Sequence, residues 1–228
     1  MSFLELWDSF DAVKEHWNSN RSMLDSYLEL IRLRAELEKS SCKRLEKITQ
    51  CSFFRMGKNT LVPVIEKLCS VYTSKLKASR LCYNTISNEI MQPLKDLLHS
   101  QESKIKEKSE QCKRLENERK KALKTLEVMK DKYWKHCKET ILNSKSRGEL
   151  AAKESSSLEA YVRQIESVNR FNVNYVEDMG RHLAIFQISE EERLKHLRES
   201  LRRLYEAESL IVNGIVSEME EIPLVTST

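Results

Sequence analysis

Apolar residues recur at intervals of three, four and seven positions along most of this chain, which is the spacing of α-helices that pack side by side. The repeat is most regular around the stretch from Glu102 to Lys138, where two sets of positions each repeat by sevens. One set contains Leu98, Ile105, Cys112, Leu126 and Tyr133. The other contains Leu94, Leu115, Ala122, Met129 and His136. Together they predict a helix with a buried seam of the coiled-coil type.

Basic side chains form a second repeat on another face of this helix. They are Lys106, Lys113 and Lys120 in one line, and Arg114 and Lys121 in the next. Residues 95–147 contain 16 basic and 9 acidic side chains, so this segment carries +7 and the rest of the chain −3 of the net +4. A local positive field indicates a polyanionic partner, either an acidic membrane or nucleic acid. The alternative is a solvated helix face without a partner.

The start of the chain predicts two helices with a break between them. Residues 2–18 carry a heavy aromatic load and form a short amphipathic helix, which we expect to face a partner rather than lie in a membrane interface. Asn18-Ser19-Asn20 is a cap-like break before a second helix at about residues 21–54, where Gly57 suits the C-cap. The broad apolar face of this second helix contains Met23, Leu24, Tyr27, Leu28, Ile31, Ala35, Cys42, Leu45 and Ile48.

Two longer helices follow, joined by a short turn. The first spans about residues 60–143, with Thr60 as its cap and Pro63 in its first turn, and it is expected to kink near Pro93 because an interior proline removes a hydrogen bond. After a turn ending at Gly148, the last helix spans about residues 149–213 and ends at Gly214. Short turns make consecutive helices antiparallel neighbours.

The composition favours an all-α fold, since 228 residues contain only 4 glycines and 3 prolines. No linker divides the chain, so residues 1–218 are expected to form a single domain, an elongated antiparallel bundle of long helices, followed by a tail at 219–228. The six cysteines form no C-x-x-C pair and indicate a reducing compartment. The N-terminus lacks the basic region of a signal peptide, and no apolar run approaches the roughly 20 residues of a membrane span.

The sequence offers no sign of catalysis. It contains no glycine-rich phosphate loop, no metal-ligand spacing among its histidines and cysteines, and no set of residues that suggests a nucleophile with its base. We therefore predict that the chain is not an enzyme and binds no metal or cofactor. Nucleic-acid binding is disfavoured as well, because no aromatic residue lies among the basic residues between Lys104 and Lys130.

Several segments resemble motifs of the F-BAR domain family, in the family's order and over about residues 3–215. They are Leu6-Trp7-Asp8-Ser9-Phe10-Asp11, Arg34-Ala35-Glu36-Leu37-Glu38 with Ser41-Cys42-Lys43-Arg44-Leu45-Glu46-Lys47-Ile48 after it, Pro93-Leu94-Lys95, the stretch from Lys132 to Glu139, and Phe186-Gln187 with Glu191-Glu192-Arg193. The resemblance implies a crescent-shaped antiparallel homodimer. Its basic concave face binds phosphatidylserine and phosphoinositides, and the dimers sense or scaffold membrane curvature.

The resemblance also assigns residues and a location. The implied lipid-binding positions are Lys104, Lys106, Lys113, Arg114, Lys120, Lys121, Lys43, Arg44 and Lys47. We place the dimer interface at Phe3, Leu6, Trp7, Phe10, Trp17 and Tyr27. The expected location is cytoplasmic and peripheral, at the inner face of the plasma membrane or on endocytic membranes, with cytoskeletal or endocytic proteins as further partners. The alternative is a non-bending dimeric coiled-coil scaffold whose main ligand is a protein.

Overall fold

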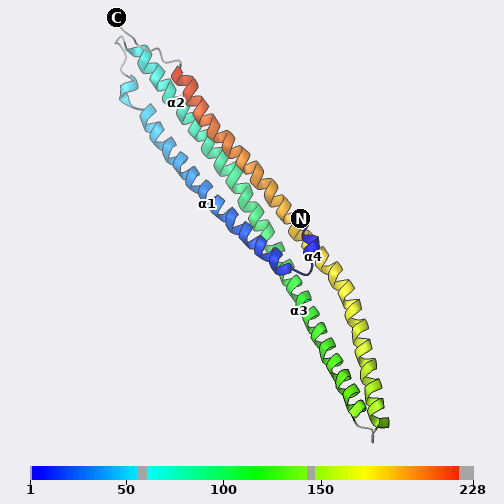
Figure 1. Cartoon of the computed structure of the whole chain (residues 1–228). Coiled ribbons are helices and arrows are strands. Elements are labelled where there is room, and N and C mark those ends of the chain that lie inside the picture. The colour runs from blue at the N-terminus through cyan, green and yellow to red at the C-terminus, as the bar shows by residue number, and fades with distance from the viewer. Residues whose placement is uncertain (1, 56–60, 143–146, 221–228) are drawn as a thin grey trace. The chain divides into compact units, whose positions relative to one another are not determined.

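The computed structural model describes residues 2–55, 61–142 and 147–220, and over these residues it contains helices and no strand. The all-α prediction is therefore confirmed. Figure 1 shows the elements, which are the 3₁₀ helix η1 (Phe3–Leu6), α1 (Phe10–Thr49), the 3₁₀ helix η2 (Ser52–Arg55), α2 (Val62–Asn84), the π-helix η3 (Thr85–Met91), α3 (Gln92–Leu142) and α4 (Arg147–Glu220).

The chain forms two compact units, and α1, α3 and α4 each contribute residues to both. Unit 1 comprises Met1–His16 and Glu102–Ser189. Unit 2 comprises Trp17–Gln101 and Glu190–Thr228.

In unit 1, α3 and α4 run antiparallel. The ring of Tyr133 stacks on that of Tyr161 with centroids 6.1 Å apart, and four residues further along α3 the Cys137 thiol donates to Glu154 Oε1 at 3.6 Å. The seam predicted from the heptad repeat is confirmed, because all ten of its residues are buried or half-buried, including the two that lie in unit 2. Ile105 and Cys112 are the most enclosed of those in unit 1.

The N-terminal segment packs on α4 of the same unit. The backbone N–H of Phe3 donates to Gln187 Oε1 at 3.1 Å, and the Tyr175 hydroxyl donates to the carbonyl oxygen of Trp7 at 3.3 Å. The Phe10 ring is fully buried and meets Phe186 edge to face, with centroids 5.7 Å apart. These contacts attach the start of the chain to the middle of α4.

In unit 2, α1 runs parallel to α4 and antiparallel to α2. Hydrogen bonds join Asn20 to Glu190, Tyr27 to Ser200 and Arg34 to Glu208, so positions advance together along α1 and α4. Between α1 and α2 the order reverses, since Glu46 pairs with Arg80 while Lys39 lies over the Tyr83 ring. The core of this unit is Leu24, Ile31, Ala35, Cys82, Ile86, Ile90, Leu94 and Ala207.

The predicted break at residues 18–20 is wrong, because α1 continues through it. Asparagine and serine in a helix interior cost only a few tenths of a kcal/mol each relative to alanine. Burial of an apolar side chain such as Trp17 or Leu24, one on either side of the break, contributes about 1.5–3 kcal/mol. The short helix expected at 2–18 is therefore η1 followed by the first turns of α1, and α1 ends at Thr49 rather than near residue 54.

The helix expected at about residues 60–143 contains a change of helix type. The π-helix η3 joins α2 to α3 without a non-helical residue, and Pro93 follows it in the first turn of α3. A proline ring clashes with the carbonyl group of the residue four positions earlier, which here is Glu89. Glu89 lies in η3, where the wider π-helical turn replaces the α-helical hydrogen bond that Pro93 cannot make. Pro63 lies in the first turn of α2 as predicted.

The last helix is longer at both ends than the sequence predicted. α4 begins at Arg147, so Gly148 is helical, and it continues through Gly214 to Glu220. One glycine destabilises a helix by about 1 kcal/mol relative to alanine, which is too little to end a long helix. Residues 219–220 of the predicted tail belong to α4. The predicted caps at Gly57 and Thr60, the turn at 143–146 and the rest of the tail lie outside the described residues.

Candidate functional site

The six basic side chains predicted on α3 are all exposed, in unit 1. Lys106, Lys113 and Lys120 each come one residue after a seam position, which turns them about 100° from the buried face. Arg114 and Lys121 each come one residue before a seam position, Leu115 and Ala122, so they too are turned about 100° from the buried face. These five form one surface, here called the cationic ridge. Lys104 precedes Ile105 and therefore flanks the seam on its opposite side.

The ridge cations are available for an external partner. Among the described residues, none of the five forms an ion pair within the chain, whereas many other basic residues do. Acidic residues lie nearby, but Glu107 is engaged by Lys108 at 3.1 Å, and this contact lowers the pKa of its carboxyl. The ridge therefore has a positive potential that is only partly offset.

Arg119 has a different role from its neighbours on α3. Its guanidinium lies 5.4 Å from the centroid of the Trp7 ring and 4.9 Å from that of Tyr175. Arg119 occupies a seam position, half-buried between the N-terminal segment and α4. It therefore holds the ridge's helix in place by a cation–π contact and does not belong to the ridge.

The second predicted cluster, Lys43, Arg44 and Lys47, is exposed on α1 in unit 2. Its neighbour Glu46 is paired with Arg80 of α2 and so is directed away from the cluster. None of the three cations is in an ion pair within the described part of the chain. The two basic clusters belong to different units.

The six residues assigned to a dimer interface, five of them aromatic, are buried or half-buried within their own chain. Phe10 and Trp17 are buried, and Phe3, Leu6, Trp7 and Tyr27 are half-buried. The Tyr27 hydroxyl lies 2.7 Å from Ser200 Oγ, and burial raises the pKa of this phenol. These residues therefore contribute to the packing of their own units.

Unit 2 carries a stripe of exposed apolar residues whose exposure the sequence did not predict, and Met23, expected on the apolar face of its helix, belongs to it. On α1 it contains Met23, Leu30, Leu33 and Leu37, and on α4 it contains Leu194, Leu201 and Tyr205. Leu37 and Tyr205 are 61% and 74% exposed, which is costly for such large side chains in water. The signal was the spacing of seven between Met23, Leu30 and Leu37, one residue before the buried set at Leu24 and Ile31.

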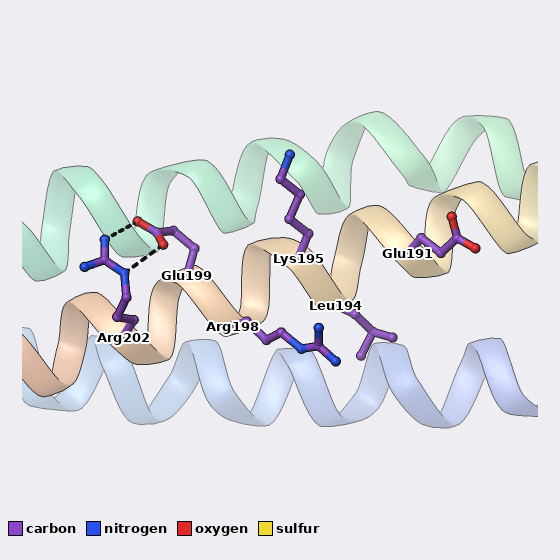
Figure 2. Close-up of a pocket in the computed structure, with 6 residues that line it drawn as sticks. All are labelled: Glu191, Leu194, Lys195, Arg198, Glu199 and Arg202. Atoms are coloured by element: carbon purple, nitrogen blue, oxygen red, sulfur yellow. Dashed lines mark hydrogen bonds and ion pairs between the residues drawn. The ribbon is translucent and has the colours of Figure 1, made fainter.

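The α4 part of this stripe borders a shallow groove. Figure 2 shows its lining residues, Glu191, Leu194, Lys195, Arg198, Glu199 and Arg202. Leu194 and Arg198 point toward α1 in this view, while Glu199 is paired with Arg202 at 2.8 Å. Apolar surface bordered by charged side chains is typical of a protein-binding face.

The described residues were also compared with the requirements of a metal site and of a membrane-spanning helix. Within the described residues, no three His, Cys, Asp or Glu side chains gather closely enough to hold a metal ion. A search of the same residues for a helix with the length and apolarity of a bilayer span found none.

Comparison with solved structures identifies the fold as that of the F-BAR domains. The chain resembles the Hof1p F-BAR domain (TM-score 0.73, 14% identity, covering 97% of this chain and 90% of that one) and the Imp2 F-BAR domain (0.77, 16%, 97% and 81%). It also resembles the EFC/F-BAR domain of Drosophila Syndapin/PACSIN (0.59, 17%, 95% and 86%). No family model and no curated protein sequence matches the chain.

Proposed function

We propose that residues 1–218 form one F-BAR domain that dimerises and binds anionic phospholipids, and so senses or scaffolds membrane curvature. The observation that carries this proposal is the cationic ridge on α3, whose five side chains are exposed and free of ion pairs within the described residues. The fold shared with F-BAR structures supports it independently.

The size of the electrostatic contribution is sufficient for peripheral binding. Each lysine or arginine near an anionic leaflet contributes about 1 kcal/mol. Five ridge cations would contribute about 5 kcal/mol per chain, and a dimer about twice that before screening by salt. Lys104 and the cluster of Lys43, Arg44 and Lys47 could add to this term where they face the same surface.

We assign the dimer contact chiefly to the exposed apolar stripe of unit 2. Two copies that cover this stripe would remove large apolar side chains from water, which is the main source of stability in obligate homodimers. Of the aromatic set proposed from the sequence, Phe3, Leu6, Trp7 and Tyr27 keep some exposed surface. Phe10 and Trp17 are buried, so they would support the interface indirectly, by packing the helices that carry it.

The finer parts of the proposal rest on the F-BAR resemblance. They are a preference for phosphatidylserine and phosphoinositides, a location at the cytoplasmic face of the plasma membrane or on endocytic membranes, and a link to cytoskeletal or endocytic proteins. No enzymatic activity is proposed.

The proposal is tested by vesicle co-sedimentation of the wild-type chain and of the variant K113E/R114E/K120E/K121E. Wild type should sediment with vesicles containing phosphatidylserine and much less with neutral vesicles, and the variant should stay in the supernatant. Equal circular dichroism spectra and equal molar mass would show that the fold and the dimer survive. Undiminished binding by the variant would refute the role of the ridge.

A second candidate is a dimeric scaffold whose main ligand is a protein. The acidic residues Glu107, Glu110 and Glu118 favour it, because they are exposed on the same helix as the ridge and offset part of its positive charge. An intact dimer that fails to bind anionic vesicles at physiological salt would support this function instead.

A further inference from the structure

The two lines of the cationic ridge can be followed by steps of seven residues along α3. Near the C-terminal end of α3, several positions on these lines hold apolar side chains instead of basic ones. The line of Lys106, Lys113 and Lys120 continues by sevens to Glu127, Trp134 and Ile141. The line of Arg114 and Lys121 continues to Val128, Lys135 and Leu142. Residues seven apart share one helix face, so the ridge and this apolar end look outward in the same direction within unit 1.

The apolar end is unusually exposed. Ile141 and Leu142 are 82% and 81% exposed, the highest values among the large apolar side chains described, and Trp134 is 54% exposed. Buried seam residues such as Cys112 occupy the other face of the same helix, so packing among the described residues does not account for the position of these side chains. A cluster of this kind on a polar helix marks a binding surface.

Cations surround the apolar end and indicate what it binds. Lys138 lies four residues after Trp134 and three before Ile141, on their face, and Lys135 precedes Leu142 by seven. Both lysines are exposed, and Lys135 reaches Glu139 only at 4.0 Å. Lysine stems can lie along apolar surface while their ammonium groups reach phosphates, as in helices that sit in a membrane interface.

We infer that the C-terminal end of α3 inserts Trp134, Ile141 and Leu142 into the headgroup–acyl boundary of an anionic bilayer, with Lys135 and Lys138 at the lipid phosphates. This inference rests on the proposed function, because the ridge would hold the same face of α3 against the membrane. Glu127 and Asp131 are exposed between the two parts, so the apolar end forms a second contact separate from the ridge.

A second copy of the chain fits this end less well than a bilayer does. Two apolar ends in contact would bring Lys135 and Lys138 of one copy against those of the other, and the acidic residues on this part of α3, such as Asp131 and Glu139, would offset this repulsion only in part. An anionic bilayer provides an apolar interior for the exposed apolar side chains and negatively charged headgroups for the two lysines.

Quenching of tryptophan fluorescence by lipids brominated on their acyl chains tests the insertion. Trp17 is buried and Trp7 half-buried, so Trp134 is the tryptophan best placed to reach the lipid. Wild type bound to brominated phosphatidylserine vesicles should lose fluorescence, and W134F should lose much less. If wild type binds through the ridge but both proteins are quenched equally, the inference is wrong and the proposed function stands. If wild type does not bind these vesicles, both are wrong.

A pair of matched variants separates insertion from self-association. I141S/L142S should lower the vesicle partition coefficient by about tenfold or more, because two apolar side chains leave the bilayer. I141L/L142I, which keeps both positions apolar, should bind like wild type. If I141S/L142S instead binds vesicles normally and has a lower molar mass in lipid-free solution, a second copy covers this end and the inference is overturned.

Discussion

Arg34 of α1 donates two hydrogen bonds to Glu208 of α4, from Nε to Oε1 at 2.6 Å and from Nη2 to Oε2 at 2.8 Å. Its Nη1 pairs with Glu38, a buried carboxylate one turn along α1. Glu38 occupies a line of buried positions spaced by seven: Phe10, Trp17, Leu24, Ile31, Glu38 and Leu45. A carboxylate in such a line needs a cation, and Arg34 supplies it while joining two helices of unit 2.

Replacing Arg34 by alanine should destabilise unit 2. The variant R34A leaves the Glu38 carboxylate buried without its partner, and we expect a loss of about 1–3 kcal/mol in the free energy of unfolding. R34K should lose less, since lysine keeps the charge but not the two-pronged geometry. Urea unfolding followed by circular dichroism measures both. R32A is the control, because Arg32 makes its pairs on the exposed face of α1; an equal loss in R32A and R34A would contradict this account.

The exposed stripe on α1 predicts a mutation that separates the dimer without unfolding the chain. In L30E/L37E, four glutamates would meet at a two-fold interface, where their desolvation and repulsion oppose association. Light scattering after gel filtration should give the mass of one chain instead of two, with an unchanged circular dichroism spectrum. V173E, at an exposed apolar position of unit 1, should stay dimeric. A dimeric L30E/L37E would place the interface elsewhere.

His182 should make unit 1 sensitive to acid. Burial lowers the pKa of this imidazole, and Lys108 of α3 and Arg181 of α4 lower it further against the opposing effects of Asp178 and Glu107. The unfolded chain therefore takes up a proton that the folded chain resists. Stability from this group is complete above the ordinary histidine pKa of about 6.5 and falls as the pH drops through that value.

The variant H182Q removes this titration and should lose less stability than wild type between about pH 7.5 and pH 5.5. Urea unfolding at several pH values gives the two slopes. Equal slopes for H182Q and wild type would show that His182 protonates as readily in the folded chain as in the unfolded one.

The repeat of seven on α3 was enough to predict the helix, its seam and the exposure of the ridge, because each depends only on local geometry. The ends of helices were harder. Asn20 and Gly214 are poor helix formers, yet both lie within helices, and for Asn20 the reason is the burial of Trp17 and Leu24 on either side of it, Leu24 in a core with residues as distant as Ala207. Such a contact cannot be read from neighbouring residues.

A face for the proposed dimer contact is difficult to predict for a related reason. α1 carries two apolar lines one residue apart, with Leu24 and Ile31 in one and Met23 and Leu30 in the other. Periodicity shows that both are apolar, but it does not show which one the chain itself covers. For the same reason, periodicity alone does not show that Phe10 packs against Phe186 of its own chain.

The central claim is that the cationic ridge of α3 contacts anionic membrane, and a matched pair of variants tests it most directly. K113E/K120E reverses two ridge cations, whereas K153E/R170E reverses two exposed cations on α4 of the same unit and changes the net charge equally. Vesicle affinity should fall strongly for K113E/K120E and only slightly for K153E/R170E, with a weaker salt dependence in the former. Equal losses in the two variants would show that binding follows total charge, and would contradict a membrane-facing ridge.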